Sequence, residues 1–122
     1  MTMGAARIRA LLDQHGLAPS RALGQNFVVD PNTVRRIAGL AGTAPGGNVL
    51  EIGPGLGSLT LALAEPGAAV TAVEIDRHLV PVLRDVVAGT EPPVRVVEGD
   101  ALSVDLESLL GSAPAWRLAA NL

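Results

Sequence analysis

The spacing of apolar positions along this 122-residue chain changes near residue 48. Before that point, apolar residues recur every three or four positions over residues 4–15 and 30–41, which predicts two amphipathic helices. Beyond it, short apolar runs alternate with helical patterns. The expected strands are residues 48–52, 69–75, 94–98 and 116–120, and the expected helices between them are residues 58–65, 77–88 and 105–110. This alternation predicts an α/β fold with a doubly wound parallel sheet.

Some residues carry finer expectations within these elements. Asp30 is placed to cap helix 30–41, and Asp76 to cap helix 77–88. Pro81 would be the fifth residue of the latter helix, where its missing N–H predicts a slight kink. The side chains of helix 30–41 expected to face inward are Val34, Ile37, Leu40 and Ala41.

A glycine-rich loop, residues 53–57, follows the first predicted strand, and a helical pattern begins at Ser58. Glycine has no Cβ, so such a loop can adopt positive φ and bring backbone N–H groups close to a ligand. The spacing is G-x-G-x-G. A dinucleotide-binding loop has G-x-G-x-x-G, with its third glycine where this chain has Ser58. The loop therefore predicts a nucleotide-type α/β fold but disfavours an NAD-dependent oxidoreductase.

Four polar or glycine positions fall at the carboxyl ends of the predicted strands, namely Gly53, Glu74, Asp100 and Asn121. Ligands of open α/β sheets bind at this edge, so the four positions predict a ligand site. Glu74 stands 21 residues after Gly53, a spacing suited to chelating ribose hydroxyls. Asp100 can accept a hydrogen bond from the exocyclic amine of a purine. Glu74 could instead be a solvated carboxylate at a strand end, and Asp100 could be a helix cap or turn residue.

Glu51 lies within the first predicted strand, where its side chain is expected to be half-buried. It would either accept hydrogen bonds from the loop backbone or be an ordinary polar residue of the strand.

Composition narrows the class of protein. An apolar content of 48% is enough to form a core, and a chain of 122 residues is one domain at most. The chain has no cysteine, and its two histidines, His15 and His78, are far apart, so a metal centre is not expected. No apolar run approaches the roughly 18 residues of a membrane span, and no secretion signal is evident. A cytoplasmic protein is expected.

Charge is distributed unevenly. Residues 1–40 contain five arginines and two acids, a balance of +3, whereas residues 41–122 contain four arginines and ten acids, a balance of −6. The basic segment is either a solvated surface or an arm that contacts phosphates. Its arginines are Arg7, Arg9, Arg21, Arg35 and Arg36.

Several short motifs together resemble the ribosomal RNA adenine N6-dimethyltransferases, over about residues 18–122. The small-subunit branch, which dimethylates two adjacent adenines, is the most similar. These motifs are Gly24-Gln25-Asn26-Phe27, Glu51-Ile52-Gly53-Pro54-Gly55-Leu56-Gly57, Val73-Glu74-Ile75-Asp76, Gly99-Asp100-Ala101 and Asn121-Leu122. The resemblance implies a Rossmann-like methyltransferase fold, S-adenosylmethionine as cofactor and small-subunit ribosomal RNA as partner, with no metal and no membrane.

The resemblance also implies roles for individual residues. Glu74 would hold the ribose hydroxyls and Asp100 the adenine amine. Asn121 would be catalytic as well as near the cofactor, because it opens the family's N-L-P-aromatic motif. The other cofactor-binding positions would be Asn26, Val28, Gly53 and Gly55, where Val28 replaces the family's usual leucine.

The chain departs from the family pattern after Leu122, where the Pro-aromatic half of the catalytic motif would follow. Residues 1–42 are expected to form a helical arm with the GQNF segment, and residues 43–122 the N-terminal half of the methyltransferase domain, with strand four as an exposed edge. Two other functions stay open. One is a large-subunit resistance methyltransferase, which Gly24 and the glycine loop disfavour. The other is a non-catalytic module that binds cofactor or RNA.

Overall fold

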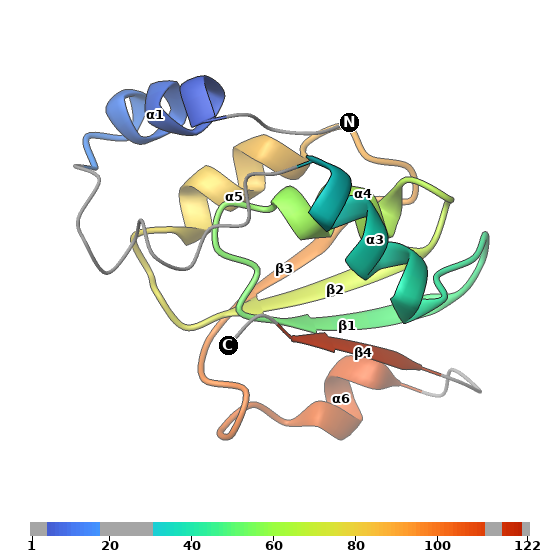
Figure 1. Cartoon of the computed structure of the whole chain (residues 1–122). Coiled ribbons are helices and arrows are strands. Elements are labelled where there is room, and N and C mark those ends of the chain that lie inside the picture. Colours follow the sequence, from blue (N-terminus) through green and yellow to red (C-terminus); the bar gives the residue numbers. More distant parts are fainter. Residues whose placement is uncertain (1–4, 18–30, 112–115, 121–122) are drawn as a thin grey trace.

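A computed structural model describes residues 5–17, 31–111 and 116–120, whose strands form one parallel sheet (Figure 1). The strands are β1 (Asn48–Ile52), β2 (Ala69–Glu74), β3 (Arg95–Glu98) and β4 (Arg117–Ala120). Their order is β3-β2-β1-β4, and each neighbouring pair is parallel. The chain therefore builds outward from β1 in both directions. This confirms the predicted α/β fold, with β4 at one edge of the sheet.

Helices cover both faces of this sheet. They are α1 (Ala5–Gln14), α3 (Pro31–Ala41), α4 (Ser58–Ala64), α5 (Val80–Val87) and α6 (Leu106–Leu110). Figure 1 shows α3, α4 and α5 on one face, α1 outside α5, and α6 on the opposite face near β4. Each element expected from the sequence is present, with ends within three residues of the predicted ones.

The core forms between the sheet and the three helices on its first face. One cluster joins α1, α4 and α5 over β2 and includes Leu12, Leu83 and Ala72. The other joins α3 and α4 over β1, β2 and β4, and includes Val34 and Ala119. Burial of this apolar surface supplies the main driving force for folding.

Helix α1 packs directly onto this core. Leu11 and Leu12 are buried in the first cluster, and Leu17 packs against it. Beyond the helix, His15 Nε2 lies 2.7 Å from Asp85 Oδ2 on α5. The first described segment is therefore fixed to the rest of the fold by both apolar and polar contacts. The boundary near residue 42 between an arm and a domain stays a prediction.

The expected kink at Pro81 is wrong. Helix α5 begins at Val80, so the proline stands in its first turn, where a helix needs no hydrogen-bonded N–H. A separate turn precedes the helix, in which Asp76 Oδ1 accepts the backbone N–H of His78 at 2.9 Å. Asp76 thus caps this turn, and Leu79 takes the N-cap position of the helix.

Helix α3 differs from the prediction at one side chain. Leu40 is 82% exposed, whereas Ala38 is buried one turn beyond buried Val34. Ile37 and Ala41 pack partly against the same cluster. The inward stripe therefore follows positions 34, 37, 38 and 41, and Leu40 lies just outside it. Asp30, the predicted cap, is outside the described residues.

Candidate functional site

The carboxyl ends of β1, β2 and β3 are joined by backbone hydrogen bonds. Gly53 N–H donates to Val73 O at 3.0 Å, and Gly99 N–H donates to Glu74 O at 2.9 Å. The predicted positions Gly53 and Glu74 are thus adjacent, and Asp100 follows immediately after Gly99. Asn121, Asn26 and Val28 lie outside the described residues, so their positions remain predictions.

The glycine loop needs glycine for its shape. Gly53, Gly55 and Gly57 have φ values of 73°, 59° and 91°, in the left-handed region that side chains disfavour. At Gly57, a Cβ would also lie 2.9 Å from Leu83 Cδ1 and 3.1 Å from Val86 Cγ1 on α5. The loop is therefore fixed against α5 before it turns into α4.

Glu74 holds this loop in place. Its side chain is 4% exposed, and its Oε1 accepts the Gly55 N–H at 2.9 Å while its Oε2 accepts the Asp76 N–H at 2.8 Å. Each oxygen retains a further lone pair for a ligand. The sequence suggested a ligand role or a solvated carboxylate but not this structural role, because the hydrogen bond to a residue 19 positions earlier depends on how β1 and β2 pair.

Asp100 is half-buried after the end of β3. Its Oδ1 accepts the Leu102 N–H at 2.9 Å, which forms the turn that its alternative interpretation predicted. Within the described chain, its Oδ2 accepts no hydrogen bond. One oxygen therefore shapes the loop while the other is available to a donor on a ligand.

Two exposed aliphatic side chains accompany these acids and were missed from the sequence. Ile75, directly after Glu74, is 67% exposed, and Leu102, two residues after Asp100, is 96% exposed. Exposed aliphatic groups next to hydrogen-bonding carboxylates suit a ligand with a flat apolar ring and a polar edge. For Ile75, the available signal was an apolar residue directly after a strand-ending acid.

Glu51 is fully buried, so the expectation of half-burial is wrong. One oxygen, Oε1, accepts the hydroxyl of Thr60 on α4, which was not predicted, and no described residue donates to Oε2. Burial raises the pKa of the Glu51 carboxyl to about 7, the Thr60 hydrogen bond opposes this rise, and the charge of Glu74 adds to it. Val49 and Glu51 share one face of β1, which explains why both are inside.

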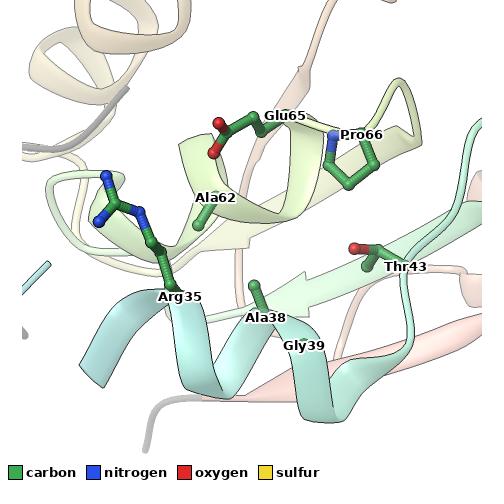
Figure 2. Close-up of a pocket in the computed structure, with 7 residues that line it drawn as sticks. All are labelled: Arg35, Ala38, Gly39, Thr43, Ala62, Glu65 and Pro66. Atoms are coloured by element: carbon green, nitrogen blue, oxygen red, sulfur yellow. The ribbon is translucent and has the colours of Figure 1, made fainter. Parts of the chain in front are cut away.

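A separate groove of about 370 Å³ lies between α3 and α4 (Figure 2). Arg35 and Glu65 approach it from opposite helices, and small side chains such as Ala38 and Ala62 form its floor. It lies at the far end of α4 from the glycine loop. The groove is therefore distinct from the strand-end site, and Glu65 is the one acid among its described lining residues.

Other kinds of site are limited within the described residues. These residues contain no group of three or more histidine or acidic side chains that could hold a metal ion. None of their helices is both long and apolar enough to cross a membrane.

A parallel α/β sheet with a glycine loop after β1 and acids at the ends of β2 and β3 defines a Rossmann-like, nucleotide-cofactor class of protein. Within that class, the family model for ribosomal RNA adenine dimethylase matches residues 18–121. The chain belongs to this family.

Individual relatives agree with the family match. The chain is 53% identical over 117 residues to ribosomal RNA small subunit methyltransferase A of Deinococcus radiodurans, covering 96% of this chain and 38% of that protein. It spans about two fifths of the length of that relative.

Solved structures give the same fold. The 23S rRNA methyltransferase ErmE matches with a TM-score of 0.59 and 42% identity, over 65% of this chain and 32% of that one. An RNA methyltransferase from Salinibacter ruber, in complex with S-adenosyl-L-homocysteine, matches with a TM-score of 0.58 and 26% identity, over 66% and 55%.

Proposed function

We propose that this chain belongs to a cytoplasmic enzyme that transfers methyl groups from S-adenosylmethionine to N6 of adjacent adenines in small-subunit ribosomal RNA. The observation that carries the proposal is the family match over residues 18–121. The 53% identity to a small-subunit methyltransferase favours that branch. Residues 43–122 would be the N-terminal half of the catalytic domain, and residues 1–42 its helical arm.

The strand-end residues suit the parts of S-adenosylmethionine. Gly53 and Gly55 would bring backbone close to its methionine portion. Glycine has no side chain in the way and tolerates the left-handed conformations of these two positions. Glu74 would accept from the ribose hydroxyls, and Asp100 Oδ2 from the adenine amine. Ile75 would supply an apolar surface for the adenine ring. Asn26, Val28 and Asn121 would complete the site.

The reaction needs positioning more than acid–base catalysis. The cofactor supplies an electrophilic methyl group on a sulfonium, which is displaced in line. Adenine N6 is a weak nucleophile because its lone pair is conjugated with the ring. We assign Asn121 the role of accepting a hydrogen bond from this amine, which favours a tetrahedral nitrogen during attack. The base must leave its stack to reach the methyl group.

A large-subunit enzyme is the second candidate, because the 23S rRNA methyltransferase ErmE is 42% identical over the matched region. The match covers 65% of this chain, against 96% for the small-subunit relative. The two candidates are separated by offering labelled S-adenosylmethionine with either small-subunit particles that lack the modification or naked large-subunit RNA. The RNA that acquires the labelled methyl groups identifies the branch.

Cofactor choice is tested by calorimetric titration of the chain with S-adenosylmethionine, its demethylated product and NAD. We expect both methyltransferase ligands to bind and NAD not to bind. Asp100→Asn should weaken binding of the adenine-containing ligands by roughly 1–3 kcal/mol, because a hydrogen bond to a charged group is removed or reversed. Leu106→Ala, away from the strand ends, is the matched control. Tighter binding of NAD would refute the proposal.

The arginines of the N-terminal segment are proposed to contact RNA. Arg7, Arg9, Arg21, Arg35 and Arg36 belong to this group, and Arg77, Arg84 and Arg95 of the acidic part form the comparison group. The test replaces the arginines of each group with glutamine and measures how the RNA affinity of each variant depends on salt concentration. Removal of each arginine that neutralises a phosphate should flatten the log–log slope by roughly 0.7 to 0.9. Equal slopes for the two groups would identify the basic segment as a solvated surface.

A further inference from the structure

Two buried carboxyl groups lie beneath the glycine loop, and no cation of the described residues stands beside them. Glu51 is fully buried and Glu74 nearly so. The chain contains no lysine, and within the described residues neither carboxyl forms an ion pair with arginine or histidine. Burying one unpaired carboxylate is costly, and burying two close together is more so. The pair is therefore short of positive charge.

Both side chains lie on the same face of the sheet. Glu51 pairs in register with Ala72, and Glu74 is two residues further along β2, so their side chains project toward the helices of that face. Glu74 uses both oxygens to accept backbone N–H groups, as expected of an ionised carboxylate. Glu51 has one oxygen bonded to Thr60 and the other, Oε2, without a partner in the described chain. The two acids thus have different surroundings.

We propose that Glu51 is protonated in the free chain and loses its proton when a cationic cofactor binds at the strand ends. This inference rests on the proposed function, because S-adenosylmethionine carries a sulfonium and an ammonium group. In the step, the O–H bond of Glu51 breaks, the proton passes to solvent, and the carboxylate left behind faces the ligand's positive charge. The cofactor thereby supplies a cation that the described residues do not place beside Glu51, and Thr60 keeps the carboxyl oriented.

The charged groups around Glu51 are consistent with this assignment. Burial is the main influence that disfavours a Glu51 carboxylate, and the charge of Glu74 on β2 acts in the same direction. Helix α4, which packs over Glu51, consists of uncharged residues. The charged side chains of α3, α5 and β4 are exposed to solvent: Arg35, Arg36, Arg84, Asp85 and Arg117. None of these replaces the missing counter-charge in the interior.

Proton release makes cofactor affinity depend on pH in a definite direction. Below neutral pH, the free chain must give up a proton to bind, so affinity should fall by up to about tenfold for each unit that the pH drops. At pH 6, binding should release most of one proton. The demethylated product, which keeps the ammonium but lacks the sulfonium, should release less if the sulfonium is the charge that Glu51 senses.

Calorimetric titration with S-adenosylmethionine at pH 6, in two buffers with different enthalpies of ionisation, measures the protons released. Glu51→Gln keeps the shape and the acceptor for Thr60 but cannot ionise, so it should bind without proton release and with an affinity independent of pH between 5.5 and 7.5. Glu98→Gln, an exposed acid at the end of β3, should behave as the unaltered chain does. Infrared spectra of the unaltered chain offer a test without a variant, since a protonated carboxyl band should disappear when cofactor is added at pH 6.

The outcomes distinguish the proton release by Glu51 from the proposed methyltransferase function. Binding by the unaltered chain without proton release, or equal release by Glu51→Gln, would overturn the inference and leave the proposed function intact. Failure of S-adenosylmethionine to bind the unaltered chain at any pH would overturn the proposed function, and the inference with it.

Discussion

Replacing Glu51 with glutamine should change how the stability of the chain without ligand depends on pH. Burial raises the pKa of this carboxyl in the folded chain from an ordinary 4.5 to about 7. Below pH 4.5 the group is protonated in both states, so ionisation carries no penalty. Between 4.5 and 7 the group ionises only in the unfolded chain. The unfolded chain therefore binds fewer protons than the folded chain, and stability falls as pH rises. Above 7 the full penalty persists.

The size of the effect follows from the same two values. The difference between 4.5 and about 7, at about 1.4 kcal/mol per pH unit, gives a penalty of roughly 3 kcal/mol at pH 8. Glutamine escapes this penalty at every pH. It has its own cost, because its amide N–H groups replace Oε2 in a position without a described partner, worth roughly 1–3 kcal/mol. Glu51→Gln should therefore be the less stable chain at pH 4.5 and draw level with, or exceed, the unaltered chain by pH 8.

Urea unfolding at five pH values from 4.5 to 8.5 measures this difference directly. The other titrating groups are shared, so subtraction of the two free energies of unfolding isolates residue 51. Glu98→Gln, on the exposed end of β3, controls for the loss of one negative charge. A difference between the unaltered chain and Glu51→Gln that stays constant with pH to within about 0.5 kcal/mol would refute the reasoning, because residual additivity errors are of that size.

Two further substitutions test the packing that positions the loop and the first helix. Gly57→Ala should lower the free energy of unfolding by roughly 2–4 kcal/mol, because alanine is strained in the left-handed conformation and its Cβ would clash with side chains of α5. Gly46→Ala, with a similar φ of 75° but no atom within 4 Å of the added Cβ, should lose only about 1–2 kcal/mol in the same urea measurement; equal losses would contradict the steric account. Leu12→Ala should cost about 2–5 kcal/mol by leaving a cavity between α1 and α5. Leu40→Ala, at an exposed position of α3, should stay within about 0.5 kcal/mol of the unaltered chain. A loss as small as this for Leu12→Ala would show that α1 is not part of the core.

The sheet could be predicted well because its signals are local. Apolar runs bounded by glycine, proline and acids define the strands, and the strand ends of a parallel sheet must share one edge. That reasoning is enough to bring Gly53, Glu74 and Asp100 to one edge from the sequence alone. It also predicts the left-handed glycine loop, whose shape is set by residue type.

What the sequence did not reveal depends on contacts between distant segments. The burial of Glu51 requires α4 to cover the first face of the sheet, and its bond to Thr60 requires the helix to begin where it does. The position of Pro81 depended on whether the residues after Asp76 form a helix or a separate turn, since both patterns satisfy the same apolar spacing. Leu40 was misplaced because helical periodicity cannot distinguish a core position from its neighbour when alanine occupies the true one.

The two acids beneath the loop show why fold and site are difficult to separate in this chain. Glu74 stabilises the loop through Gly55 and Asp76, so replacing it with alanine removes two backbone partners as well as a ligand contact. A loss of cofactor binding in such a variant therefore cannot be assigned to the ribose alone. The Glu51 side chain accepts no backbone N–H from the described residues, and its replacement by glutamine changes charge while keeping the Thr60 acceptor. A ligand cation bound above both acids would favour the ionised form of Glu51, which burial disfavours in the free fold and the charge of Glu74 disfavours further. Affinity and stability should therefore rise together when that charge arrives.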